Sequence, residues 1–321
     1  MFALLKTMNK YYAGNVKILL DLFDKMVVPI ALYNCEVWGN ILLPKNVNIT
    51  NYFSEGNIVN IVEQLQNKFL KYMLGINTKS TNWVARSELG RRPLTMTVYE
   101  RIIKYFQHTN KSKSNIIQEA MQTNKNLYQN GNKSWYTGFK RILQYIEIDE
   151  SKVIELKPKC KDGNKIMTKL YDITWEGERE KIEHQGKHRL YAEIKTNNCL
   201  EKYFEIDNMN IRKAIAKMRT SSHKFPIETG RYERKERYDR ICPLCCNNIG
   251  DEHHYIFECE DQNITNTREK YMRNILKKSP QLEILSSIER LKYMLICKDE
   301  SLIKDIGILF LKIQKVFENC T

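Results

Sequence analysis

The sequence predicts a mainly α-helical protein with one small knob rich in cysteine and histidine. Apolar residues recur every three or four positions in several segments, which is the period of a helix face. The sequence contains no run of strongly alternating apolar and polar residues and no internal repeat. Its composition, 42% hydrophobic and 10% aromatic, is that of a folded chain. We therefore expect helices along the chain, with short β pieces only at the knob.

The first expected region, residues 1–109, is helical. An amphipathic run in it ends at Gly75, a residue type that commonly terminates helices. Thr81 or Asn82 can then cap a short helix that extends through Glu88. A further amphipathic run completes the region.

The second expected region, residues 110–200, is a connector with loop-rich segments. Residues 110–134 are rich in Asn, Lys, Ser and Gln, which predicts an exposed linker. Ser134 can cap a helix that follows, and residues 155–165 are again expected to form a loop.

The third expected region, residues 201–321, holds a basic helix, the knob and the C-terminal helices. Asn210 is a candidate for the start of the basic helix. Ser286 and Glu289 have the spacing of a capping box, and Ser301 can cap the last helix.

The formal net charge of +14 predicts a polyanionic partner. Residues 101–141 contain eight lysines and arginines and one acid, and residues 212–240 contain ten against four acids. The most apolar stretch, residues 18–33, is interrupted by charged residues and Pro29, so we expect a core segment and no membrane span. The first residues do not resemble a signal peptide, and we expect an intracellular protein, nuclear or cytoplasmic, with reduced cysteines.

The knob contains four candidate metal ligands, Cys242, Cys245, His254 and Cys259. Three thiolates and one imidazole at this spacing are typical of a tetrahedral Zn²⁺ site, and a full set of four protein ligands predicts a structural role. Each of the adjacent pairs at 245–246 and 253–254 needs to supply only one ligand, so Cys246 and His253 are alternatives to Cys245 and His254. Buried free thiols are the competing interpretation.

Basic and aromatic residues precede the knob. Arginine forks suit phosphates, and the tyrosines among them, Tyr232 and Tyr238, could stack on unpaired bases. A solvated charged face is the alternative. No glycine-rich phosphate loop, serine nucleophile elbow or Asp-Asp pair occurs, so the sequence offers no candidate catalytic centre.

Four stretches, in this order, resemble the C-terminal part of reverse transcriptases from LINE-like non-LTR retrotransposons. They are Leu22-Phe23-Asp24 through Trp38-Gly39, with Asn34 where the family usually has glycine; Phe69 through Glu88-Leu89-Gly90-Arg91-Arg92-Pro93-Leu94; Arg219 through His223 to Ile227-Glu228-Thr229-Gly230-Arg231; and the Cys242 to Cys259 knuckle. The family's knuckle pattern favours His254 as the ligand.

The resemblance implies a thumb-like helical region, a helical connector and a small Cys₃His zinc knuckle followed by C-terminal helices. It implies binding to element RNA, template–primer duplex or target DNA. The polymerase palm, which would be the partner of these regions in the parent polypeptide, is not part of the sequence, so the chain alone is expected not to be an enzyme. The basic stretches and the resemblance together single out as nucleic-acid contacts Arg91, Arg92, Arg212, Arg219, His223, Lys224, Arg231, Arg234, Arg237 and Arg240. The alternatives are a zinc-stabilised protein-interaction module and an inert remnant of a decayed element.

Overall fold

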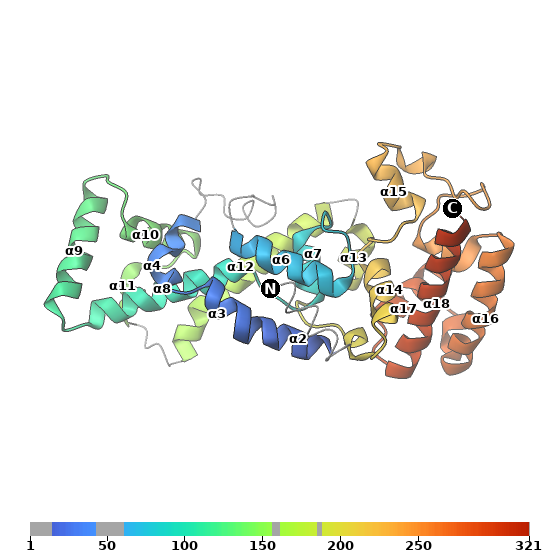
Figure 1. The fold of residues 1–321 in the computed structure, drawn as a ribbon, viewed down its shortest axis with the longest axis horizontal. Coiled ribbons are helices and arrows are strands. Elements are labelled where there is room, and N and C mark those ends of the chain that lie inside the picture. The colour runs from blue at the N-terminus through green and yellow to red at the C-terminus, as the bar shows by residue number, and fades with distance from the viewer. Residues whose placement is uncertain (1–14, 43–60, 156–160, 185–187, 321) are drawn as a thin grey trace. The chain divides into compact units, whose positions relative to one another are not determined.

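The computed structural model describes residues 15–42, 61–155, 161–184 and 188–320 (Figure 1). In these residues helices are the only regular elements, and no named β-strand is formed. A Cys₃His cluster lies near the C-terminal region, and helices follow it. The predicted fold class is therefore confirmed. No helix in the described part of the chain combines the length and apolarity that crossing a bilayer requires.

The chain divides into two compact units, each built from segments that are distant in sequence. One unit comprises residues 1–22, 69–90 and 182–321, and the other comprises residues 23–68 and 91–181. The three consecutive regions expected from the sequence stay a prediction.

The unit formed by residues 23–68 and 91–181 has an aromatic core. The rings of Phe106 and Phe139 stack with their centroids 4.0 Å apart, and Trp135 stacks on Phe139 at 5.8 Å. Asn34 takes the left-handed backbone conformation with φ of 51°, which glycine and asparagine tolerate best. The elements within this unit are η1 (Phe23–Val27), α3 (Val28–Ala31), α4 (Cys35–Trp38), η2 (Gly39–Leu42), α8 (Leu94–Lys111), α9 (Asn115–Gln129), α10 (Trp135–Tyr145) and α11 (Glu150–Glu155). Two further helices contain the points where the chain passes between the units, α6 (Ile61–Leu74) and α12 (Lys161–His184).

The expected linker at 110–134 is instead mostly a helix, α9. None of its residues is buried, although Ile117, Met121 and Tyr128 recur at helical spacing, and the abundance of Asn, Lys, Ser and Gln obscured this pattern in the sequence. Its polar side chains bond along the helix: the Thr123 hydroxyl donates to the Glu119 carbonyl. Gly131, with φ of 76°, lies in the turn that ends it.

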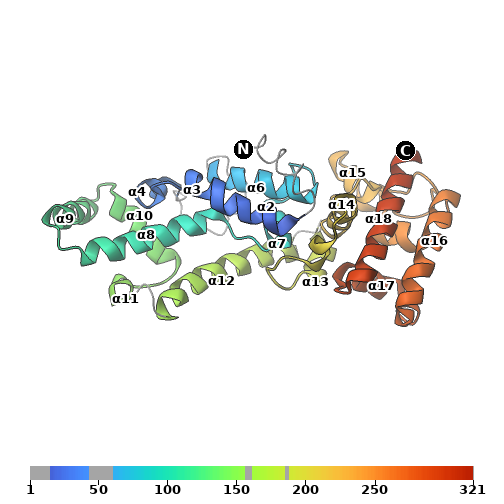
Figure 2. The ribbon, with the colours of Figure 1, turned by 60° about the horizontal axis from the view of Figure 1, so that its bottom comes forward.

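The other unit is a helical bundle in which α18 packs against both α14 and α16. Figures 1 and 2 show α16 and α18 side by side from two directions. Gly307 allows α18 to approach α14 closely, because a Cβ atom there would lie 2.4 Å from Cγ2 of Ile211. The elements of this unit are α2 (Val16–Leu22), α7 (Asn82–Glu88), α13 (Arg189–Ile194), η4 (Lys202–Glu205), α14 (Met209–Arg219), α15 (Pro226–Tyr232), η5 (Arg237–Asp239), η6 (His254–Glu258), α16 (Gln262–Lys278), η7 (Pro280–Glu283), α17 (Ser287–Ile296) and α18 (Glu300–Cys320).

Several predicted helix boundaries are confirmed. Gly75 follows α6 with φ of 66°, and Thr81 precedes α7 at its N-cap. At the start of α17 the Ser286 hydroxyl accepts a hydrogen bond from the Glu289 amide, and the Glu289 carboxylate accepts one from the Ser286 amide.

Two predicted caps lie elsewhere. The side chain of Asn208, rather than Asn210, caps α14 by accepting from the amides of Asn210 and Ile211. The last helix begins at Glu300, and the Asp299 carboxylate, rather than Ser301, accepts from the Leu302 amide at 2.8 Å. Neighbouring polar residues compete for the same cap, and the sequence alone does not rank them.

Candidate metal centre and basic arm

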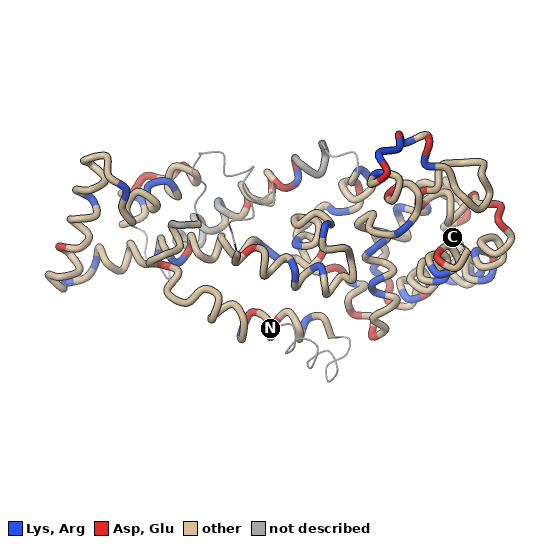
Figure 3. Tube along the Cα trace, turned by 45° about the horizontal axis from the view of Figure 1, so that its top comes forward, with Lys and Arg blue, Asp and Glu red and all other residues tan. Residues whose placement is uncertain are grey.

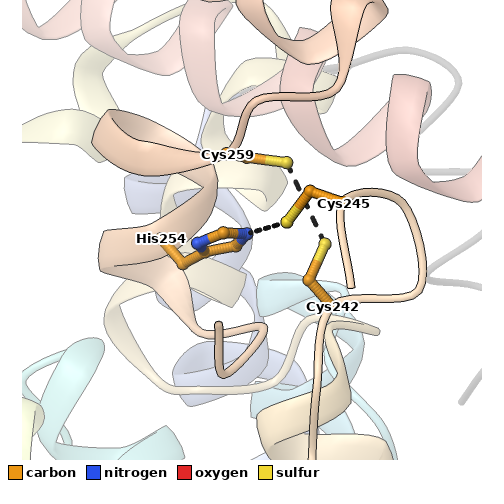
Figure 4. Close-up of side chains that lie close together, drawn as sticks. All are labelled: Cys242, Cys245, His254 and Cys259. Atoms are coloured by element: carbon orange, nitrogen blue, oxygen red, sulfur yellow. Dashed lines mark hydrogen bonds between the residues drawn. The ribbon is translucent and has the colours of Figure 1, made fainter. Parts of the chain in front are cut away.

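The side chains of Cys242, Cys245, His254 and Cys259 converge on one point (Figure 4). Their donor atoms all lie within 4.8 Å of one another. The sulfurs of Cys242 and Cys259 are 3.9 Å apart, and Nε2 of His254 is 3.3 Å from the Cys245 sulfur. A tetrahedron with ordinary Zn–S and Zn–N bonds has edges of about 3.5–3.8 Å. The cluster could therefore bind a metal ion.

Two backbone turns place these ligands. In the first, the Cys246 amide donates to the Cys242 carbonyl at 2.9 Å, and an antiparallel bridge between Ile241 and Ile249 closes the loop. The second is the π-helical turn η6, in which the Cys259 amide donates to the His254 carbonyl at 2.8 Å. This wider turn brings His254 and Cys259 to the same point although four residues separate them.

The structure selects one member of each ambiguous pair. Cys246 is exposed, and its sulfur lies 3.8 Å from the Pro243 carbonyl, outside the cluster. Nε2 of His253 lies 2.7 Å from the Ser287 hydroxyl, on the α17 side. Cys245 and His254 are the members that join Cys242 and Cys259.

The electrostatics of the site favour an anionic sulfur. Burial opposes ionisation of Cys242, but hydrogen bonds from His254, Tyr255 and neighbouring backbone amides lower the pKa of its thiol to about 6. Burial lowers the pKa of His254, but contacts with Cys242 and Cys245 outweigh it and raise that pKa above its ordinary value. Burial also raises the pKa of Cys259 to about 12. An incoming cation would stabilise the thiolate forms of all three cysteines.

A second layer of residues orients the ligands. Nδ1 of His254 is buried and has no hydrogen-bond partner among the described residues, but it faces Oε2 of Glu258 at 3.7 Å. Metal-binding histidines commonly present their other nitrogen to a carboxylate in this way. Tyr255 is fully buried, and its ring packs against Phe225 and Phe317, which joins the knuckle to α18.

Three of the predicted nucleic-acid contacts are buried and have structural roles. Arg219 is 1% exposed, Arg212 is 5% exposed and His223 is 5% exposed. The Arg212 guanidinium donates to backbone carbonyls, and Nε2 of His223 lies 2.8 Å from Glu252. Side chains placed in this way cannot reach a phosphate outside the unit. Basic charge and the family resemblance were the sequence signals for these residues, and neither distinguishes a core position from a surface position.

Arg219 lies in a buried ion-pair network. Its Nε atom donates to Oε1 of Glu88 at 2.6 Å, and its Nη2 atom lies 3.2 Å from Glu201. The Tyr203 hydroxyl also donates to Glu88, at 2.8 Å. Glu88 and Glu201 are partners that the sequence analysis missed, because each is more than ten residues away from Arg219 along the chain.

Most of the remaining predicted contacts in this unit lie within a segment that we call the basic arm, residues 231–241. Arg234 and Arg237 are exposed, and Tyr232 and Tyr238 are 66% and 68% exposed. Arg240 is half-buried, and its guanidinium holds the arm by donating to the Ile227 and Lys235 carbonyls.

The last members of the predicted set differ in their surroundings. Lys224 is exposed and pairs with Glu318 at 3.4 Å, and Arg231 pairs with Glu228 at 3.3 Å. Arg91 and Arg92 belong to the other unit, where Arg91 pairs with Asp24 at 2.6 Å and Arg92 lies over the ring of Tyr171. Figure 3 shows that lysine and arginine positions occur throughout the described chain.

Comparison with known proteins returned no match: no protein-family model, no curated protein and no solved structure is significantly similar to the chain.

Proposed function

We propose that this chain is a nucleic-acid-binding, C-terminal part of a non-LTR retrotransposon reverse transcriptase, stabilised by one structural Zn²⁺. The observation that carries the proposal is the position of the basic arm. An exposed segment with cations and tyrosines leads directly into a closed Cys₃His cluster.

Zinc is the metal that best fits the donor set. Soft thiolates with one imidazole in tetrahedral array select Zn²⁺ over magnesium or calcium, which prefer oxygen ligands. Three of the four ligands are buried, and four protein ligands leave no position for water or substrate. The ion would fold the knuckle and fix the end of the basic arm, because Cys242 directly follows it.

The basic arm supplies chemistry suited to single-stranded or irregular nucleic acid. The exposed guanidinium groups of Arg234 and Arg237, the latter 3.8 Å from the Asp251 carboxylate, can bind phosphates in a bidentate manner. Tyr232 and Tyr238 offer exposed rings on which bases can stack. The net charge of +14 adds long-range attraction to any polyanion.

The internal contacts of the motifs support the reverse-transcriptase assignment. Glu88 comes from the second resembling stretch and Arg219 from the third, and they form a buried ion pair. His223 of the third stretch faces Glu252 of the knuckle at 2.8 Å. Motif residues that depend on one another in the fold are expected to occur together. No polymerase chemistry is assigned to these residues, and in the parent enzyme the palm would supply it.

The test is binding of the zinc-loaded chain to a structured RNA, a single strand and a DNA duplex across a salt series. We expect binding whose affinity falls steeply with salt. The double variant Arg234→Ala, Arg237→Ala should bind nucleic acid more weakly than the control double variant Lys277→Ala, Lys304→Ala. The control removes the same charge from α16 and α18. Replacing Tyr232 and Tyr238 by alanine should weaken binding to the single strand selectively.

A folded, zinc-loaded chain without nucleic-acid affinity would contradict the proposal. It would favour a zinc-stabilised protein-interaction module. A chain that takes up no zinc and does not fold would favour an inert remnant.

A further inference from the structure

A groove between α16 and α18 is lined by cations and contains no acid. Its volume is about 380 Å³. The residues that line it are Asn266, Thr267, Lys270 and Tyr271 from α16 and Lys312, Lys315, Val316 and Asn319 from α18. None of these residues was singled out by the sequence, because residues 252–321 contain eleven lysines and arginines and eleven acids and so show no excess of positive charge.

Helical geometry explains why these side chains meet. Lys312, Lys315 and Asn319 are spaced by three and four residues, so they share one face of α18. On α16, Asn266 and Lys270 share a face for the same reason. The two helices are held together by buried residues such as Ile275 and Ile313, which leave the polar side chains at the rim.

The three lysines lack carboxylate partners in the described part of the chain, although other cations on the same helices have them. Lys278 pairs with Asp305 at 2.6 Å, and Arg273 lies 3.7 Å from Glu269. Among the described residues, no such pair involves the lysines of the groove, which are Lys270, Lys312 and Lys315. Like charges gathered around one groove repel one another, and an external anion would relieve this repulsion.

We propose that this groove binds the phosphodiester backbone of the nucleic acid, as a contact surface separate from the basic arm. The inference rests on the proposed function. Lysine ammonium groups bind phosphates as point charges, and the amides of Asn266 and Asn319 and the hydroxyl of Thr267 can donate hydrogen bonds to phosphate oxygens. The groove reads no base edge, so its contribution to binding is independent of sequence.

Other polyanion carriers fit the groove less well. An amphipathic helix or a lipid surface needs a broad apolar face, whereas Val316 and Tyr271 are the only lining residues of the groove with large apolar side chains. An acidic peptide remains the alternative that the experiment has to separate from nucleic acid.

The test compares two variants with equal charge loss. The groove variant carries Lys270→Ala, Lys312→Ala and Lys315→Ala. The control carries Lys277→Ala, Lys298→Ala and Lys304→Ala, three exposed lysines of the same unit that do not line the groove. Zinc content and thermal melting establish that both variants fold. Loss of three phosphate contacts should lower the magnitude of the salt slope by about 2–3 and weaken binding on the order of 10²-fold at 0.1 M salt, and the control slope should change by less than about 1.

A second readout locates the contact. Bound RNA or DNA should shield Lys270, Lys312 and Lys315 from amine acylation, measured by mass spectrometry, while Lys277 stays reactive. Polyglutamate of matched charge serves as the acidic-peptide probe. Shielding by polyglutamate alone would overturn the nucleic-acid assignment.

The outcomes separate the two proposals. If the groove and control variants bind equally while the Arg234 and Arg237 variant binds poorly, the groove inference fails and the proposed function stands. If the unaltered chain binds no nucleic acid, both fail.

Discussion

The buried pair between Glu88 and Arg219 shows how single residues support the metal-binding unit. The two residues are 131 positions apart in the sequence, and their side chains are 0% and 1% exposed. Arg219 also donates to the Leu295 carbonyl, so it joins α7, α14 and α17. A charge this deeply buried is tolerated only because its partners satisfy it.

Removing one partner of this pair should destabilise the unit strongly. Arg219→Met leaves Glu88 buried without its main counter-charge, and we expect a loss of about 3–5 kcal/mol in the free energy of unfolding. The double variant with Glu88→Leu should lose less, because it leaves neither charge of the pair behind. Urea unfolding of the single and double variants measures this coupling, and strictly additive losses would contradict the pairing.

Acid should weaken the same pair. Burial alone would raise the pKa of Glu88, but the charges of Arg219 and Lys195 and hydrogen bonds outweigh burial and lower it from its ordinary value of 4.5. A carboxyl group with a lowered folded-state pKa stabilises the protein above its unfolded pKa. That contribution is therefore complete above about pH 4.5 and is lost as the pH falls from there through the folded-state value.

Residue types alone did not reveal which charges act at the surface. Arg219 and Arg234 belong to the same basic stretch, yet one is a core residue and the other is exposed. The ligand cysteines were predictable because their chemistry restricts both spacing and identity. Arginine has no such restriction, and its role depends on carboxylates that approach from distant segments.

At the scale of elements, the knuckle turn explains why one cysteine of the adjacent pair is a ligand. Cys246 has φ of 59°, the left-handed conformation that closes the turn after Cys245. In this conformation its side chain leaves the cluster and is exposed. The turn needs a residue at this position that tolerates positive φ, and it does not need a sulfur atom there.

Two glycine substitutions test this geometry. Cys246→Gly should keep one zinc per chain at unchanged or higher affinity, since glycine adopts the left-handed conformation without strain. Cys245→Gly removes a ligand and should weaken zinc binding by more than the factor of about 10–100 that is typical for loss of an outer-shell partner. Competition with a chromogenic chelator gives both affinities, and equal effects of the two substitutions would contradict the assignment.

Helix boundaries with strong local chemistry were predictable, and those without it were not. Gly75, Thr81 and the Ser286–Glu289 box marked their boundaries correctly. Helix α9 was missed because its composition, rich in Asn, Lys, Ser and Gln, is typical of an exposed loop, although Ile117, Met121 and Tyr128 recur in it at helical spacing. The wider hydrogen-bond pattern of the π-helical turn η6 places two ligands and has no sequence signal of its own.

At the scale of the whole molecule, the division into two units depends on contacts between distant segments. The unit that contains the knuckle combines residues 69–90 with residues 182–321, and the other contains residues 91–181. Periodicity and composition act over windows of about 10–20 residues and carry no information on such pairing. Because of this limit, the sequence could suggest only regions made of consecutive residues.

This division predicts that metal removal acts locally. Zinc binding contributes folding free energy only to the segment that it closes, here residues 242–259 and the elements packed on them. Chelation should therefore increase amide hydrogen exchange in η6 and in the basic arm by at least about tenfold, and in part of α18 through the contact between Tyr255 and Phe317. Helices α8 and α10 belong to the other unit, and their hydrogen exchange should not change.

Hydrogen-exchange mass spectrometry with and without chelator, using Cys246→Gly as a zinc-competent control, measures this local effect. A uniform increase over both units would show that they unfold together, because loss of the knuckle would then remove stability from the whole chain.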